Sequence, residues 1–187
     1  TTGVGALTEI DGTLSPWAGD GQDMYRIHID GGRTFSATTV GGVAGFDSEL
    51  FLFDNNGKGV YGNDDVVSDN APATLPAGNA LTPIASGDYY LVITQCCSEP
   101  TSSGGQIFPV SDTFDNHNND INGPTGPGGT LPVISYSGLY EDIPGGGSYR
   151  VFLTGAHAAI VPEPQAFALM LAGLGMVSFF AYRRTTA

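Results

Sequence analysis

The chain of 187 residues is long enough for one domain of ordinary size and a tail. It contains 28 glycines and only 13% charged residues, a composition that favours short strands joined by tight turns and argues against a helical bundle. The formal net charge of −13 repels phosphate backbones, so we expect no nucleic-acid partner.

The N-terminal part of the chain predicts strands and no helix. Residues 1–3 contain neither a Met nor a basic segment followed by an apolar one, so we expect the numbering to begin on a processed chain without its signal peptide. The first clear strand runs through Tyr25, Ile27 and Ile29, which alternate with polar residues. The glycine pair at 31–32 then predicts a turn.

Further strands follow at fairly regular spacing. The segment 46–53 is rich in Phe and Leu, and the polar residues 54–57 after it predict a tight turn. The segments 88–94 and 148–154 are the clearest strands in the chain. Short strands with turns between them predict an all-β antiparallel sandwich over residues 1–160.

Several of these segments also resemble a known module. In the order seen in bacterial pre-peptidase C-terminal (PPC-like) domains, the chain carries the segments 23–27, 32–35, 46–54, 62–65 and 87–92. The resemblance implies a jelly-roll-like β-sandwich appended to a secreted protein, and several members of the broader group bind calcium. The chain departs from the simple module by an insertion at 96–147, before the last strand.

Side chains with oxygen atoms gather in two neighbouring loops, which lie in the stretches 47–56 and 63–65. Such side chains are the ligands that Ca²⁺ requires, and a site can draw them from separated turns. The candidate calcium ligands are Asp47, Asp54, Asn56, Asn63, Asp64 and Asp65. The alternative is that these residues only form turns and cap strands.

The insertion at 96–147 is rich in Gly, Asn, Asp, Ser and Pro, and loops of this length are usually functional or disordered. Strand fragments are expected at 106–110 and 131–136, and if the insertion is ordered we expect a partner or an ion to order it. It opens with the adjacent pair Cys96 and Cys97. In an oxidising compartment the pair can close a vicinal disulfide; two free thiols or bonds to another chain are the alternatives.

Catalytic motifs are missing from the sequence. There is no nucleophile-elbow motif and no glycine-rich phosphate loop. The three histidines, His28, His117 and His157, lack the spacing of zinc ligands. We therefore expect that the protein is not an enzyme.

The C-terminal tail predicts a membrane span. The run 166–182 carries no charge and, at about 1.5 Å per residue, extends about 26 Å as a helix, enough for a thinner bilayer. A basic tail at 183–187 follows it. Because positive residues stay cytoplasmic, this orientation places residues 1–160 in the periplasm of a single-pass inner-membrane protein.

The same tail resembles a sorting signal. Pro162, Glu163 and Pro164 lie in a junction at 161–165, the apolar run follows, and Arg183 and Arg184 close it. This order resembles the PEP-CTERM signal of Gram-negative bacteria. The resemblance implies export and processing by an exosortase, an integral-membrane protease, near the Pro-Glu-Pro motif.

Two functions remain open at this point. The first is a non-catalytic exported surface or matrix protein that binds polymer, ion or protein outside the inner membrane. The second is a membrane-anchored accessory subunit of a large complex, such as a photosynthetic or respiratory assembly, whose acidic domain covers the periplasmic face. In that case Gly173 and Gly175 would let a neighbouring helix approach the anchor closely.

Overall fold

The computed structural model describes residues 5–42, 46–66, 72–95, 98–109, 121–138 and 146–159. The elements in these ranges are almost all β-strands, with one short 3-10 helix. In chain order they are β1 (Glu9–Leu14), η1 (Pro16–Ala18), β2 (Gln22–Ile29), β3 (Ser36–Thr38), β4 (Ser48–Asp54), β5 (Gly59–Asn63), β6 (Thr74–Leu75), β7 (Gly87–Gln95), β8 (Glu99–Ser102), β9 (Gly105–Gln106), β10 (Ser135–Ser137), β11 (Gly147–Thr154) and β12 (Ala156–Ala158).

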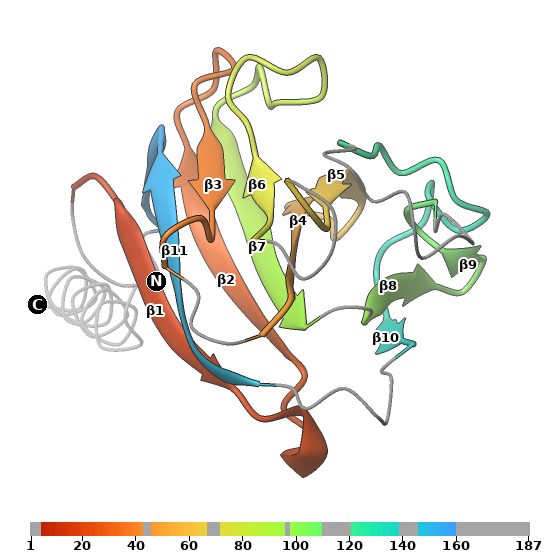
Figure 1. The fold of residues 1–187 in the computed structure, drawn as a ribbon. Coiled ribbons are helices and arrows are strands. Elements are labelled where there is room, and N and C mark those ends of the chain that lie inside the picture. The colour runs from red at the N-terminus through yellow and green to blue at the C-terminus, as the bar shows by residue number, and fades with distance from the viewer. Residues whose placement is uncertain are drawn as a thin grey trace, which may run out of the picture.

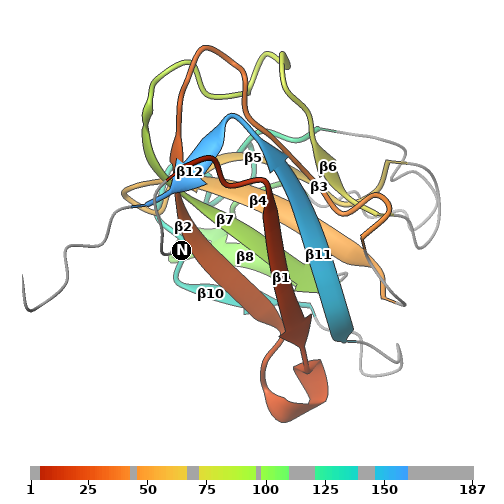
Figure 2. The same cartoon turned by 90° about the vertical axis from the view of Figure 1, so that its left-hand side faces the viewer.

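Two antiparallel sheets form the body of the molecule. One has the strand order β1-β11-β3-β6 and the other the order β12-β2-β7-β4-β5. They lie as two layers in Figure 1, and the quarter turn in Figure 2 shows β1 and β11 side by side on one of them. The predicted β-sandwich is confirmed at this level, and the strands predicted at 88–94 and 148–154 correspond to β7 and β11.

The main core lies between the two sheets, as the alternation of apolar residues predicts. Ile27 and Ile29 of β2 are fully buried in it, and Leu50 and Leu52 of β4 pack in the same cluster. Val151 and Leu153 of β11 reach it from the opposite sheet. Each strand therefore points every second side chain into one shared core.

The insertion is more regular than its composition predicts. Its described part contains β8, β9 and β10, which form a separate three-stranded antiparallel sheet on the β5 side of the sandwich (Figure 1). Phe108 from this insertion stacks on Phe51, with ring centroids 5.2 Å apart, and meets the edge of Phe53 at 6.0 Å. A second small apolar core thus covers the outer face of β4, so apolar packing contributes to the order of the described insertion.

The predicted membrane anchor at 166–182 lies outside the described residues. Within the described ranges, no helix combines the length and the hydropathy that a bilayer crossing requires. The anchor therefore stays a prediction from the sequence.

Candidate metal centre

Three carboxylates meet at the open end of the β4–β5 hairpin. Asp47 immediately precedes β4, and Asp64 and Asp65 immediately follow β5. Because Leu50 pairs with Asn63 in the antiparallel ladder, the start of β4 lies beside the end of β5. One carboxylate oxygen from each aspartate lies within 4.8 Å of the others.

Two glutamates extend this group of acids. Continuing the hairpin register by one residue places Glu49 opposite Asp64, so their side chains share the face of the sheet that the insertion covers. Glu49 is only 1% exposed, and the hydroxyl of Thr94 donates a hydrogen bond of 2.7 Å to its Oε2 atom. Glu99, the first residue of β8, interacts electrostatically with both Glu49 and Asp64. We call Asp47, Glu49, Asp64, Asp65 and Glu99 the acidic cluster.

Two carboxyls of the acidic cluster, those of Glu49 and Asp64, hold their protons more tightly than exposed carboxyls do. Burial, together with the negative charges of Asp47, Asp65 and Glu99, raises the pKa of Asp64 to about 8. Burial also raises the pKa of Glu49 well above its ordinary value, with further contributions from Glu99 and Asp64. Both pKa shifts have the same causes, because loss of hydration and nearby negative charge both disfavour the ionised form of a carboxyl group. At neutral pH the cluster favours either bound protons or a bound cation.

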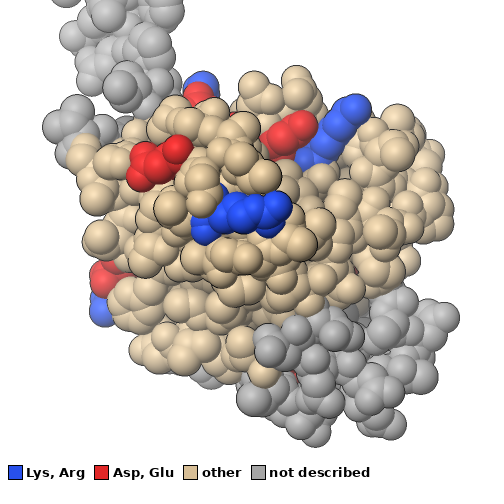
Figure 3. Space-filling model, turned by 90° about the horizontal axis from the view of Figure 1, so that it is seen from above, with Lys and Arg blue, Asp and Glu red and all other residues tan. Residues whose placement is uncertain are grey.

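This excess of acid is local. The described face seen from above in Figure 3 shows few charged residues, and basic atoms adjoin several of its acidic ones. No group of acids comparable to the acidic cluster is visible on the described part of this face.

The donor atoms of the acidic cluster fit calcium. All are carboxylate oxygens, which are hard ligands suited to Ca²⁺, whereas zinc sites usually include nitrogen or sulfur. Oxygens that share one Ca²⁺ at about 2.4 Å lie at most about 4.8 Å apart. The spacing of Asp47, Asp64 and Asp65 meets this limit.

The structure separates Asp54 and Asn56 from this cluster and gives Asn63 a different role. Asp54 lies in the turn at the opposite end of β4, about 20 Å away along the strand, where its Oδ1 accepts hydrogen bonds from the backbone N–H groups of Asn56 and Lys58. Asp54 therefore stabilises a turn, which is the alternative role that the sequence left open. Asn63 lies at the cluster, but its amide donates to the carbonyl of Asp65 and accepts from the backbone N–H of Thr74. Its hydrogen bonds hold the loop that carries Asp65.

Sequence reasoning missed Glu49 and Glu99. Glu49 could have been noticed, because a charged residue inside the apolar segment 46–53 is costly to bury without a specific role. Nothing in the sequence around Glu99 predicts that it meets β4, since the two are brought together only by the packing of the insertion.

The remaining predicted residues lie outside the described ranges. They are the Cys96 and Cys97 pair, the motif Pro162, Glu163 and Pro164, and the anchor residues Gly173, Gly175, Arg183 and Arg184.

Comparison with known proteins identifies the tail. A family model described as a PEP-CTERM protein-sorting motif matches residues 161–184, which confirms the resemblance predicted from Pro162, Glu163 and Pro164. The resemblance to PPC-like domains stays a prediction. No curated protein and no solved structure matches the chain. The PEP-CTERM motif implies an exported protein that associates with the membrane and is sorted by an exosortase.

Proposed function

We propose that the protein is a non-catalytic surface or matrix protein whose β-sandwich binds Ca²⁺ at the acidic cluster after export. The observation that carries this proposal is the approach of Asp47, Asp64 and Asp65 within 4.8 Å of one another. Burial and the neighbouring acids Asp47, Asp65 and Glu99 both raise the pKa of Asp64, and a divalent cation would neutralise the negative charge of this group.

Within the cluster the residues have different tasks. Asp47, Asp64 and Asp65 supply the oxygens that hold the cation, and Glu49 adds buried negative charge beneath them. Glu99 comes from the insertion, so a cation that attracts it also fastens the insertion to the sandwich. The cation supplies the positive charge that removes repulsion between the two parts.

Export places such a site where free Ca²⁺ is abundant, which agrees with the sorting motif at residues 161–184. The alternative role, an anchored accessory subunit, depends on Gly173 and Gly175, which lie outside the described residues. It stays a prediction.

Calcium binding is tested by isothermal titration of the full chain in a mild detergent, after treatment with EDTA. We expect saturable binding that Asp64→Asn weakens by at least about tenfold, because one of the converging carboxylates is lost. Asp54→Asn is the matched control, since it is the same substitution at the far end of β4 and an amide oxygen can still accept the turn hydrogen bonds. Absence of binding, or equal losses in both variants, contradicts the proposal.

Sorting is tested separately by the mass of the protein recovered from cells. We expect the mature protein to have lost the segment after the Pro-Glu-Pro motif, and to retain it in cells that lack the exosortase. An intact tail on the mature protein in exosortase-containing cells contradicts this part of the proposal and favours the anchored subunit.

A further inference from the structure

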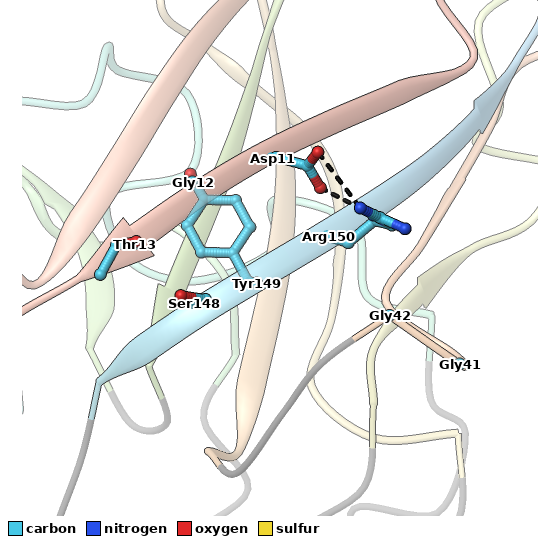
Figure 4. A pocket seen from close by; sticks show the side chains of 8 residues that line it. All are labelled: Asp11, Gly12, Thr13, Gly41, Gly42, Ser148, Tyr149 and Arg150. Carbon is cyan, nitrogen blue, oxygen red and sulfur yellow. Dashed lines mark hydrogen bonds and ion pairs between the residues drawn. The ribbon is translucent and has the colours of Figure 1, made fainter.

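A groove lies on the outer surface of the other sheet, away from the acidic cluster. It has a volume of about 480 Å³ and is lined by residues of β1, of β11 and of the loop after β3 (Figure 4). The lining residues are Asp11, Gly12, Thr13, Gly41, Gly42, Ser148, Tyr149 and Arg150.

The pairing of β1 with β11 creates an ordered row of hydrogen-bonding groups in this groove. Asp11 pairs with Arg150 and Thr13 with Ser148, and these four side chains are exposed. The residues that alternate with them along each strand point the other way; Tyr149, between Ser148 and Arg150, faces the core and is buried. The outer surface of the two strands therefore offers a carboxylate, a guanidinium and two hydroxyls within one groove.

The charges in the groove are largely compensated. The Nε atom of Arg150 lies 2.7 Å from Oδ1 of Asp11 and 3.1 Å from Oε1 of Glu9, as ion pairs on the open surface. The pair of Asp11 and Arg150 stands at the centre of the view in Figure 4. The site thus presents donors and acceptors together without a strong charge of either sign.

One side of the groove is formed by the glycine backbone of Gly41 and Gly42, without side chains. A Cβ atom on Gly42 would come within 2.5 Å of the carbonyl oxygen of Arg150, so the loop backbone lies directly against β11. Gly41 has a positive φ of 78°, a conformation that favours glycine. A ligand can therefore approach the backbone there without meeting side chains.

An exposed aromatic residue lies just beyond one end of this row. After Thr13 the chain continues through the end of β1 into η1. There Trp17 is 66% exposed in a turn that an isolated backbone bridge between Ser15 and Asp20 closes. It is also the single Trp of the chain, so its fluorescence reports on this region alone.

We infer that this groove binds a neutral glycan chain. A row of donors and acceptors with compensated charge matches hydroxyl groups, which both donate and accept hydrogen bonds. The lining contains no aliphatic side chain, which disfavours an apolar peptide. The acidic character of the chain disfavours an anionic polymer. This inference does not depend on the proposed calcium site.

The inference is tested by affinity electrophoresis of the full chain in gels that contain dextran, hydroxyethylcellulose or alginate, all in EDTA because Ca²⁺ crosslinks alginate. We expect retardation by at least one of the two neutral glycans and none by alginate. Ser148→Arg fills the groove from an exposed position and should weaken the retardation by at least about tenfold in apparent affinity. Thr154→Arg is the matched control, because it adds the same side chain to the same face of β11 about 20 Å away.

A second readout uses the unmodified protein. Titration with the retarding glycan should shift the emission of Trp17 if the chain extends past Thr13, and Ser148→Arg should remove this shift. Retardation that is absent with both neutral glycans, that appears only with alginate, or that Ser148→Arg and Thr154→Arg reduce equally overturns the inference. Asp64→Asn should leave the retardation unchanged, which separates this result from the outcome for calcium.

Discussion

Asp64 follows β5 and Asp11 lies in β1 of the same sandwich, yet their surroundings shift the pKa of the two carboxyls in opposite directions. Burial and neighbouring acids raise the pKa of Asp64 to about 8. A hydrogen bond from the Arg150 guanidinium lowers the pKa of the exposed Asp11 carboxyl. One aspartate therefore needs a proton or a cation at neutral pH, whereas the other is already compensated.

The difference shows that residue type alone does not define a metal site here. The sequence offers many acids, and among the described residues Asp47, Asp64 and Asp65 are the ones whose carboxylate oxygens converge within 4.8 Å. The exposed acids of β1 instead meet a basic residue across the ladder. Four measurements test whether the surroundings of Asp64 and Asp11 differ in this way.

The largest expected effect is stabilisation by calcium. At pH 8 and a free Ca²⁺ concentration about 1,000 times the Kd, we expect about 4 kcal/mol of added stability, which raises the midpoint of thermal unfolding by about 8–16 °C over that in EDTA. Differential scanning calorimetry measures the shift. A midpoint that is the same in Ca²⁺ and in EDTA would mean that the acidic cluster is compensated by protons alone.

The second effect is the pH dependence without calcium. Because the pKa of Asp64 is higher in the folded protein than in the unfolded chain, the folded state holds an extra proton between about pH 4 and pH 8. Stability should therefore fall as the pH rises through this window, by about 3–4 kcal/mol between pH 5 and pH 8 in EDTA. Urea unfolding at several pH values measures it, and saturating Ca²⁺ should flatten the dependence. Stability that rises with pH in EDTA is incompatible with the buried cluster.

The third effect is removal of one charge from the cluster. In EDTA at pH 8, Asp64→Asn should stabilise the protein by about 1–2 kcal/mol, because the amide carries no charge beside Asp47, Asp65 and Glu99. The same variant should lose most of the gain from Ca²⁺. Urea unfolding with and without Ca²⁺ measures both, and Asp54→Asn serves as the control. A destabilised Asp64→Asn in EDTA would show that the carboxylate already has adequate compensation.

The smallest effect is expected at the exposed pair. Arg150→Gln removes the partner of Asp11 and Glu9 on the open surface, where exposed ion pairs contribute little. The midpoint of thermal unfolding should stay within about 2 °C of the wild-type value, with or without Ca²⁺. A larger drop would give this pair a structural role that its exposure does not predict.

Much of the sandwich could be predicted from local sequence patterns. Alternation through Ile27 and Ile29, the turn signal at 54–57 and the strands at 88–94 and 148–154 each depend on neighbouring residues alone. The insertion was predicted less well: β9 and β10 overlap only one end each of the fragments expected at 106–110 and 131–136. Its strands β8 and β10 are short and polar, so they carry no clear period, and their pairing joins segments far apart in the chain.

The candidate site was likewise predictable in part from local sequence and in part only from the tertiary structure. The type of chemistry, oxygen ligands in loops beside the β4–β5 hairpin, followed from the sequence, as did the sorting motif that the comparison confirms. Which residues converge was decided by the tertiary structure, because antiparallel pairing carries Asp54 to one end of the hairpin and brings Asp47 to Asp64 at the other. Packing of the insertion then adds Glu99 and buries Glu49, and burial is what changes the pKa of these acids.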